Sequence, residues 1–247
     1  MLETLNQIDA SVFLFFNGMH TPFLDRFMML FTDRFIWIPM YAAILIVLLR
    51  THGVKSAAFY VAGIALAITL TDQTCATFIR PAVERLRPSN LENPLSALTI
   101  IVDDYRGGSY GFPSCHSANS FALATFLAFL FPRRRMVLFI FGWAILNSYT
   151  RLYLGVHYPG DLIVGAIIGS GFGYACYHLA HFLAPSGKSA ESGMTRLRRP
   201  MFTIPFRPAW DGKENSSITI TIGDILIAVG IFTSAIIIAA AAITHQA

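Results

Sequence analysis

Residues 56–79 read SAAFYVAGIALAITLTDQTCATFI and contain one charged side chain, Asp72. A helix needs about 20 consecutive apolar residues to cross the hydrocarbon core of a bilayer. This stretch is therefore long enough and apolar enough to span a membrane, and it predicts a transmembrane helix. Arg80 is the next residue, so the helix is expected to end at the headgroups, where a basic segment begins.

The composition of the whole chain is that of a membrane protein. Of its 247 residues, 55% are apolar and 13% are charged, and the mean hydropathy is +0.57. Soluble domains carry about 25% charged residues, so a soluble protein of this length would lack the charge to cover its surface. These values exclude a disordered protein, a secreted disulfide scaffold and an ordinary cytosolic enzyme. The cysteines are too scattered for a disulfide framework: they are Cys75, Cys115 and Cys176.

Further apolar runs predict an all-α, polytopic transmembrane bundle with a five-helix core and one extra C-terminal transmembrane helix. Residues 8–31 are apolar but interrupted by polar residues and Pro22. We interpret them as an interfacial or re-entrant helix, with a true span as the alternative. The expected spans are Phe35–Leu49, Ser56–Ile79, Ser117–Phe131, Met136–Tyr149, Leu162–Ala184 and Ile225–Ile243.

Basic residues between these runs predict the orientation of the chain. They follow the first, third and fifth spans, which places them on one side if the spans alternate, and the positive-inside rule makes that side cytoplasmic. Loops 80–116 and 150–161 then share the opposite face. The net charge of +4 is thus explained by topology, and its pattern does not indicate a nucleic-acid partner. The residues concerned are Arg50, Lys55, Arg133, Arg134, Arg135, Lys188, Arg196, Arg198, Arg199, Arg207 and Lys213.

The same pattern divides the chain into three parts. We expect a membrane domain over residues 1–187, a basic cytoplasmic linker over 188–217 and an accessory helix over 218–247.

The first chemical motif of the outer face is RPAVERLRP, residues 80–88. Arg80 and Arg87 are seven residues apart, which would place both on one helix face despite Pro81. Two guanidiniums at that spacing suit the oxygens of a phosphate. The alternative is a structural membrane protein whose arginines anchor helix ends at the headgroups.

The second motif is PSCH, residues 113–116, directly before the third span. Ser114 is suited to cap the helix, and the N–H groups at a helix start form an anion site. His116 would lie in the first turn, beside a bound anion. A histidine at the level of the headgroups is the alternative interpretation.

The third motif runs from Thr150 and Arg151 to His157 and Asp161, where the fifth span begins. Pro159 suits the first position of that helix. Asp161 is close enough in sequence to accept a hydrogen bond from one nitrogen of His157. Such a bond fixes the tautomer and leaves the other nitrogen free as a nucleophile, although a His–Asp contact can also be purely structural.

Together the motifs supply a phosphate cradle, a nucleophile with its orienting acid and a second histidine able to protonate a leaving group. Phosphoryl transfer asks for positioning and charge stabilisation of this kind. We expect no cofactor, because the arginines can neutralise the developing charge and would repel a metal ion.

The three motifs resemble the signature of the type 2 phosphatidic acid phosphatase (PAP2) superfamily, the lipid phosphate phosphatases. That signature reads K-x6-R-P, P-S-G-H and S-R-x5-H-x3-D, and its elements occur here in order between residues 80 and 161. Three positions depart from it: Arg80 replaces lysine, Cys115 replaces glycine and Thr150 replaces serine. None of these changes removes a catalytic group.

The resemblance implies a metal-independent membrane lipid phosphatase. His157 would attack phosphorus to form a phosphohistidine, Asp161 would orient it and His116 would act as general acid. The substrate would be undecaprenyl diphosphate, a lipid A phosphate, phosphatidylglycerophosphate or phosphatidic acid, within a bacterial inner membrane and with the site on its periplasmic face. The phosphate would be bound by Arg80, Arg87, Ser114, Cys115 and Arg151.

Several alternatives stay open at this point. A vanadate-dependent haloperoxidase shares the motif pattern but is soluble, and a catalytically silent lipid-phosphate-binding protein could keep the pocket. Gly165, Gly169 and Gly173 form a stripe for close helix packing, inside the bundle or in a homodimer. Asp72 is a functional candidate because acids within membranes are rare, or else a buried structural acid. Residues 103–112 could be a mobile rim or an inert loop.

Overall fold

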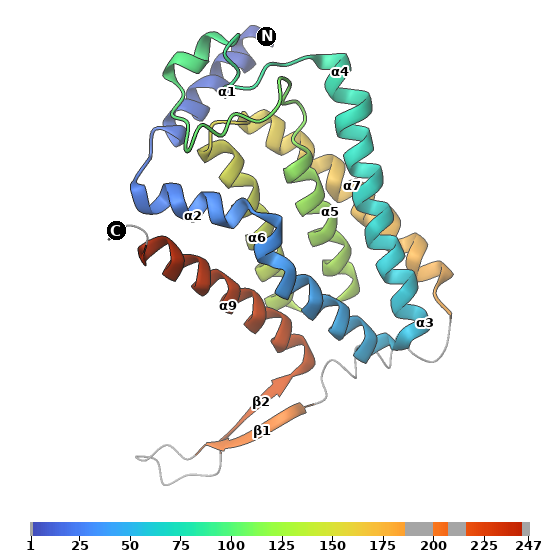
Figure 1. The fold of residues 1–247 in the computed structure, drawn as a ribbon. Helices are drawn as coiled ribbons and strands as arrows, with labels where there is room; N and C mark the ends of the chain where they lie inside the picture. The colour runs from blue at the N-terminus through green and yellow to red at the C-terminus, as the bar shows by residue number, and fades with distance from the viewer. Residues whose placement is uncertain (1, 186–199, 207–215, 244–247) are drawn as a thin grey trace.

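The apolar runs of the sequence fold as helices that pack side by side in a bundle (Figure 1). The computed structural model describes residues 2–185, 200–206 and 216–243. Its α-helices are α1 (Leu2–Asn17), α2 (Pro22–Thr32), α3 (Ile38–Gln73), α4 (Arg80–Val83), α5 (Cys115–Leu130), α6 (Arg134–Tyr153), α7 (Pro159–Leu183) and α9 (Ile222–Ile243). Short 3₁₀ turns cover Arg34–Trp37 and Pro94–Leu98, and a π-helical turn covers Thr74–Ile79.

Helix α3 contains the first two expected spans and bends sharply between them. Gly53 lies at the bend with φ 75° and ψ 163°, a conformation that glycine adopts without steric cost. The two halves of α3 therefore run in opposite directions and form a V (Figure 1). The polar residues around Gly53 lie at the point of the V, where the chain turns back.

The helix at the first motif ends before Arg87, although the seven-residue spacing of Arg80 and Arg87 predicts a helix that contains both. Helix α4 stops at Val83, and Glu84 adopts the left-handed conformation with φ 49°. Arg80 is therefore on a helix, whereas Arg87 lies in the extended segment that follows, where Leu86 forms a β-bridge with Tyr110. The expectation that both arginines share one helix face is wrong, because the chain leaves the helix between them.

Helices α5 and α7 pack against each other along the glycine stripe. A Cβ atom built on Gly165 would lie 2.5 Å from the carbonyl oxygen of Ser114, and one on Gly169 would overlap the carbonyl of Ala118. The stripe thus allows two backbones to meet inside the bundle, as one of the two interpretations predicted. Because α5 covers these glycines, they do not form a seam with a second copy of the chain.

All three motifs lie at one end of the bundle. Arg80, the start of α5 and the start of α7 are at the upper end in Figure 1, whereas the bend of α3 and the connection between α5 and α6 are at the lower end. This is the arrangement that alternating spans require. Within the described part of the chain, three helical stretches are long and apolar enough to cross a membrane, namely Arg34–Val83, Pro159–Leu183 and Asp224–Ile243. The predicted class, a helical transmembrane bundle, is confirmed.

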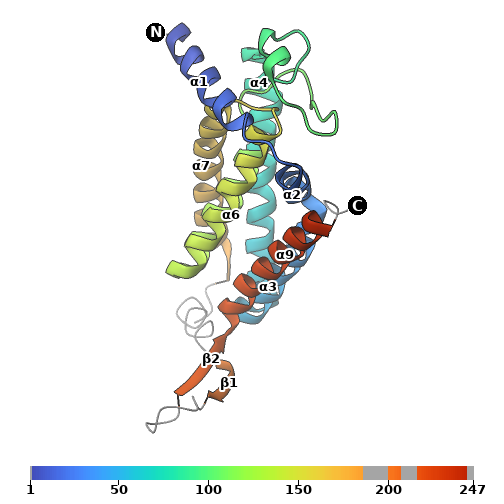
Figure 2. The ribbon, with the colours of Figure 1, turned by 90° about the vertical axis from the view of Figure 1, so that its left-hand side faces the viewer.

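Residues 8–31 form parts of two helices, α1 and α2, which Gly18–Thr21 separate. Thr21 caps α2 by accepting a hydrogen bond from the N–H of Leu24 at 3.2 Å. Helix α1 lies at the motif end of the bundle, where it contacts α6 and α7, and α2 packs beside α6 and α9 (Figure 2). Both helices therefore approach the loops that carry the motifs.

The C-terminal part of the chain differs from a plain linker. Its described residues form two antiparallel strands, β1 (Pro200–Phe206) and β2 (Ser216–Thr221), paired from Pro200↔Thr221 to Phe206↔Ser216. Helix α9 then packs beside α2 and α3 (Figure 1). The rest of the expected linker, with Lys188, Arg196, Arg198, Arg199, Arg207 and Lys213, lies outside the described residues.

Candidate active site

The structure brings the three motifs into direct contact. The N–H of Ser114 donates to the carbonyl of Asp161 at 3.0 Å, which joins the second motif to the third. Arg80 Nη2 donates to the carbonyl of Pro113 at 3.2 Å, which joins the first to the second. Segments that are about 80 residues apart in the chain therefore form a single site.

His157 and Asp161 form the expected pair. His157 Nδ1 lies 3.2 Å from Asp161 Oδ2, and both side chains are almost completely buried. Asp161 Oδ2 also accepts the N–H of Tyr158 at 3.0 Å and so caps the first turn of α7. Because the carboxylate can only accept, this contact places the proton on Nδ1 and leaves a lone pair on Nε2.

The Nε2 atom of His157 faces a guanidinium. Arg87 Nη1 lies 3.0 Å from it, while Arg87 also donates to the carbonyls of Tyr110 and Val156 at 3.1 and 3.2 Å. The expected free nitrogen is thus occupied by an arginine. A phosphate held by Arg87 would take that position and would present its phosphorus to Nε2.

Burial and neighbouring arginines control the charge of this pair. Burial, and then the positive charge of Arg87, hold the pKa of His157 well below its ordinary value of 6.5. Burial and the charges of Arg80 and Arg151 lower the pKa of Arg87 to about 10, so Arg87 stays protonated at neutral pH. The site therefore combines a neutral imidazole with cationic anion-binding groups, which is what nucleophilic attack on a phosphate needs.

We expect His157 to stay neutral well below pH 6.5 because both causes lower its pKa. In a ¹⁵N NMR titration of the solubilised protein with labelled histidine, the His157 signals are those missing from His157→Gln. They should keep the shifts of the neutral Nδ1–H tautomer as the pH falls through 6.5. The unfolded chain takes up this proton near 6.5, so His157 should lower stability as pH falls below that value. Titration of the ring near pH 6.5 would contradict the assignment.

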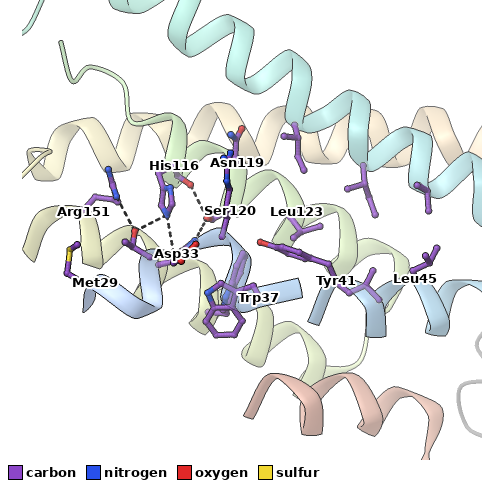
Figure 3. Close-up of a pocket in the computed structure, with 18 of the residues that line it drawn as sticks. Met29, Asp33, Trp37, Tyr41, Leu45, His116, Asn119, Ser120, Leu123 and Arg151 are labelled. Carbon is purple, nitrogen blue, oxygen red and sulfur yellow. Dashed lines mark hydrogen bonds between the residues drawn. The ribbon is translucent and has the colours of Figure 1, made fainter. Parts of the chain in front are cut away.

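His116 lies in the first turn of α5 and is oriented by two neighbours (Figure 3). His116 Nε2 lies 3.1 Å from Asn147 Oδ1 and 3.3 Å from Thr32 Oγ1. Asn147 Nδ2 donates to Ser120 Oγ at 2.8 Å, which fixes the orientation of the amide. Since Asn147 Oδ1 can only accept, Nε2 carries a proton, and Nδ1 is the nitrogen available for exchange with a substrate.

Arg151 and Arg80 complete the cationic lining. Arg151 Nη2 donates to the hydroxyl of Tyr105 at 2.8 Å, and Arg80 Nη2 donates to Cys115 Sγ at 2.9 Å. Both Nε atoms are buried without a hydrogen-bond partner among the described residues. Buried donors of this kind are normally paired, so an anionic ligand would satisfy groups that the protein alone does not.

The start of α5 is built as the second motif predicts. Ser114 is its N-cap, and the Oγ atom accepts the N–H of Ser117 at 3.4 Å. The N–H groups of Cys115 and His116 occupy the first two helical positions, which have no partner within the helix. The Ser114 side chain is thus used as a cap, and the backbone N–H groups after it are the ones placed to receive an anion.

Several residues that the sequence analysis does not single out also contact the site. They come from the N-terminal helices, from the segment 103–112 and from α6, and no local signal identifies them in the sequence. The segment 103–112 is hydrogen-bonded to the first motif rather than projecting from it. Arg85 does belong to the first motif, but its spacing does not distinguish it. The residues concerned are Asp9, Thr32, Arg85, Tyr105 and Asn147.

A cavity of about 950 Å³ opens beside His116 and Arg151 (Figure 3). From there it continues between the two halves of α3, where its walls are apolar. One end is thus polar and adjoins the site, and the other is suited to hydrocarbon. Apolar residues of the lining include Tyr41, Ile44, Leu45, Leu48, Val61, Ile64, Ile68, Leu123 and Trp143.

The acidic, histidine and cysteine side chains do not gather as metal ligands do. Within the described residues, no three of them are grouped closely enough to hold a metal ion. Asp72 accepts a hydrogen bond from Asn119 Nδ2 at 3.3 Å and so faces the bundle, in agreement with the structural interpretation of that acid.

Comparisons with known proteins agree with this geometry. The model of the PAP2 superfamily matches residues 57–184, which contain all three motifs. The chain is 57% identical over 183 residues to a lipid A 4'-phosphatase of Bacteroides thetaiotaomicron, covering 74% of this chain and 81% of that protein. It is 32% identical over 176 residues to a lipid A 4'-phosphatase of Porphyromonas gingivalis, covering 71% and 74%.

Solved structures show the same fold. Aquifex aeolicus LpxE superposes with a TM-score of 0.50 at 26% identity, over 68% of this chain and 93% of that one. A transmembrane PAP2 type phosphatidylglycerolphosphate phosphatase from Bacillus subtilis superposes with a TM-score of 0.56 at 18% identity, over 74% and 90%. The chain therefore belongs to the PAP2 superfamily and is one of its membrane-embedded lipid phosphate phosphatases.

Proposed function

We propose that this enzyme removes the 4'-phosphate of lipid A through a phosphohistidine on His157. The buried pair of His157 and Asp161, facing the guanidinium of Arg87, carries the proposal for the chemistry. The relatives named lipid A 4'-phosphatase support the substrate, because one of them is 57% identical over 74% of the chain.

The proposed reaction has two steps. In the first, Nε2 of His157 attacks phosphorus and the bond from phosphorus to the lipid oxygen breaks. His116, which enters this step protonated on both ring nitrogens, gives that oxygen its Nδ1 proton and keeps the proton on Nε2. In the second, water attacks the phosphohistidine, His116 takes a proton from the water, and phosphate leaves with His157 restored. Arg80, Arg87, Arg151 and the N–H groups of Cys115 and His116 would stabilise the charge on the phosphate oxygens.

The cavity supports a lipid rather than a soluble phosphate as the substrate. Its apolar part lies between the halves of α3 and its polar end reaches His116 and Arg151. A phosphate at this polar end would leave room for an acyl chain along Leu48 and Ile64.

Filling the cavity should discriminate between long and short lipids. We expect Ile64→Trp to lower kcat/KM for lipid A by about 10-fold or more, because the indole would occupy the space of the chain. Hydrolysis of a short-chain phosphatidic acid should change by less than about 3-fold. Ile167→Trp is the matched control, since Ile167 on α7 is 67% exposed and outside the cavity lining. Equal losses on both substrates would contradict an acyl-binding role.

We propose that the site faces the periplasm of a bacterial inner membrane. The basic residues Arg50, Lys55 and Arg133–Arg135 lie at the opposite end of the bundle, and positive charge favours the cytoplasmic side. Leu91→Cys and Val54→Cys test this, since Leu91 is 78% and Val54 74% exposed at the two ends. In intact cells with a permeable outer membrane, an impermeant maleimide should label Leu91→Cys above the background that the native cysteines give in the wild type, and should add no label in Val54→Cys. Labelling of Val54→Cys alone would reverse the orientation.

The proposed function is tested by phosphate release from purified protein in detergent with EDTA present. Four substrates should be compared: lipid A, undecaprenyl diphosphate, phosphatidylglycerophosphate and phosphatidic acid, with His157→Ala as the control. We expect release from lipid A, with loss of the 4'-phosphate identified by mass spectrometry, and none from the variant. Preferred release from another lipid would overturn the substrate assignment, and activity that EDTA abolishes would overturn the metal-independent mechanism.

A further inference from the structure

Arg85 connects the catalytic pair to the N-terminal helix. Arg85 Nη1 lies 2.9 Å from Asp161 Oδ1, and Arg85 Nη2 lies 2.7 Å from Asp9 Oδ2. The guanidinium also lies over the ring of Tyr158, 4.0 Å from its centre. One arginine is thus held by two carboxylates and an aromatic face, and its side chain is 21% exposed.

Asp9 makes a second contact, with the start of α7. Its Oδ1 atom accepts the N–H of Gly160 at 2.7 Å. Gly160 lies directly before Asp161, in the first turn of the helix, where N–H groups lack intrahelical partners. A Cβ atom on Gly160 would lie 2.9 Å from Asp9 Oδ2, so glycine allows this close approach. Asp9 therefore contacts both the backbone beside Asp161 and the arginine that pairs with it.

The arrangement assigns each oxygen of Asp161 a separate task. Oδ2 accepts from His157 Nδ1 and Tyr158 N–H, and Oδ1 accepts from Arg85. A buried carboxylate without a cationic partner is costly, so Arg85 is needed to keep Asp161 charged. Asp9 pairs with the other terminal nitrogen of Arg85 and so fixes the guanidinium in the geometry in which it meets Asp161.

We propose that Asp9 is a positioning residue for the phosphatase reaction. It acts through Arg85 to hold Asp161, and through Asp161 to hold the Nδ1–H tautomer of His157, without touching the substrate. The inference rests on the proposed function of His157 as the nucleophile. Asp9 lies on α1, outside residues 57–184 that match the family model, so the N-terminal helix completes a site whose motifs lie elsewhere.

The test is Asp9→Asn, which keeps the size of the side chain and removes its charge. We expect kcat to fall by about 10- to 100-fold, the range seen when the partners that orient a metal-bound histidine are removed. KM should change by less than about 2-fold, because Asp9 does not contact the substrate. Glu3→Gln is the matched control: it removes a carboxylate from an exposed position of the same helix and should leave kcat unchanged.

Two further measurements separate positioning from simple stabilisation. In the ¹⁵N NMR spectrum, Asp9→Asn should shift His157 away from the pure Nδ1–H tautomer, whereas a loss of stability alone would leave the signals of the folded protein unchanged. In a double-mutant cycle, Asp9→Asn should cause no further loss in the background of Arg85→Gln, because the proposed path runs through Arg85.

The outcomes distinguish this inference from the function on which it rests. The proposed function would be refuted if the wild-type protein released no phosphate, or if His157→Ala released it as the wild type does. If the wild type is active and the kcat of Asp9→Asn is within about 2-fold of that of Glu3→Gln, only the proposed role of Asp9 is refuted. An additive loss in the double mutant would also refute it, since the two residues would then act independently.

Discussion

Replacing Asp161 by asparagine should lower kcat by about 10⁴-fold, as the same change of the orienting carboxylate does in a serine protease. Asp161 is fully buried, and its Oδ2 atom accepts from His157 Nδ1 at 3.2 Å. Asparagine keeps the shape of the side chain but can present an N–H to Nδ1, which would stabilise the wrong tautomer of His157. The measurement is kcat for phosphate release from the lipid substrate.

A control is needed because Asp161 also caps α7 and pairs with Arg85. The inhibition constant of vanadate, an analogue of phosphate, reports whether the anion site is intact. It should change by less than about 5-fold in Asp161→Asn, since the arginines that bind the anion are retained. A variant that keeps a tenth or more of the wild-type kcat would contradict the orienting role.

Replacing His116 by glutamine should have an effect that depends on the leaving group. General acid catalysis contributes about 10²- to 10⁴-fold to a rate, and we expect a loss of that size in kcat/KM for a lipid phosphate. The lipid alkoxide is a poor leaving group and needs a proton as it departs. Glutamine can still contact Asn147 and Thr32, which hold His116 in the wild type at 3.1 and 3.3 Å.

The contrast comes from a phosphate ester of p-nitrophenol, whose leaving group is stable as an anion. For this ester, His116→Gln should lose less than about 10-fold in kcat/KM, because no proton is required in the first step. Equal losses for the two esters would show that His116 binds the phosphate rather than protonating the leaving group.

The spans could be predicted from the sequence because each depends on a long apolar run. The bend at Gly53 and the close packing of α5 on α7 were both indicated locally, by polar residues between two runs and by the stripe around Gly169. The pair of His157 and Asp161 was predictable for a similar reason. Four residues separate them in sequence, and a helix start fixes their relative position.

Other features depend on contacts between distant segments. Thr32 accepts a hydrogen bond from Arg151, 119 residues away, and Asp9 accepts one from Gly160, 151 residues away. No periodicity or spacing reports such contacts. The left-handed conformation of Glu84 could not be predicted from the sequence either, because a non-glycine residue rarely adopts it. Because the helix ends at Glu84, between Arg80 and Arg87, the prediction that both arginines share one helix face is wrong.

The paired strands β1 and β2 show a further limit of composition. The segment 188–217 is basic and has no apolar period, which favours an extended linker. Part of it nevertheless pairs with residues just before α9, from Pro200↔Thr221 to Phe206↔Ser216. The hairpin projects from the end of the bundle (Figure 1), so its strands are defined by their pairing with each other, which a basic composition does not report.

Trapping the phosphoenzyme tests the role of His157 as the nucleophile most directly. Purified protein should be mixed with lipid A carrying a ³²P-labelled 4'-phosphate, quenched in alkali within a single turnover, and digested. We expect the label on the peptide that contains His157, stable in alkali and lost in acid, as a phosphohistidine is. His157→Ala should carry none. The central role of His157 would be contradicted by either of two results. One is release of labelled phosphate without any labelled His157 peptide, and the other is label on His116.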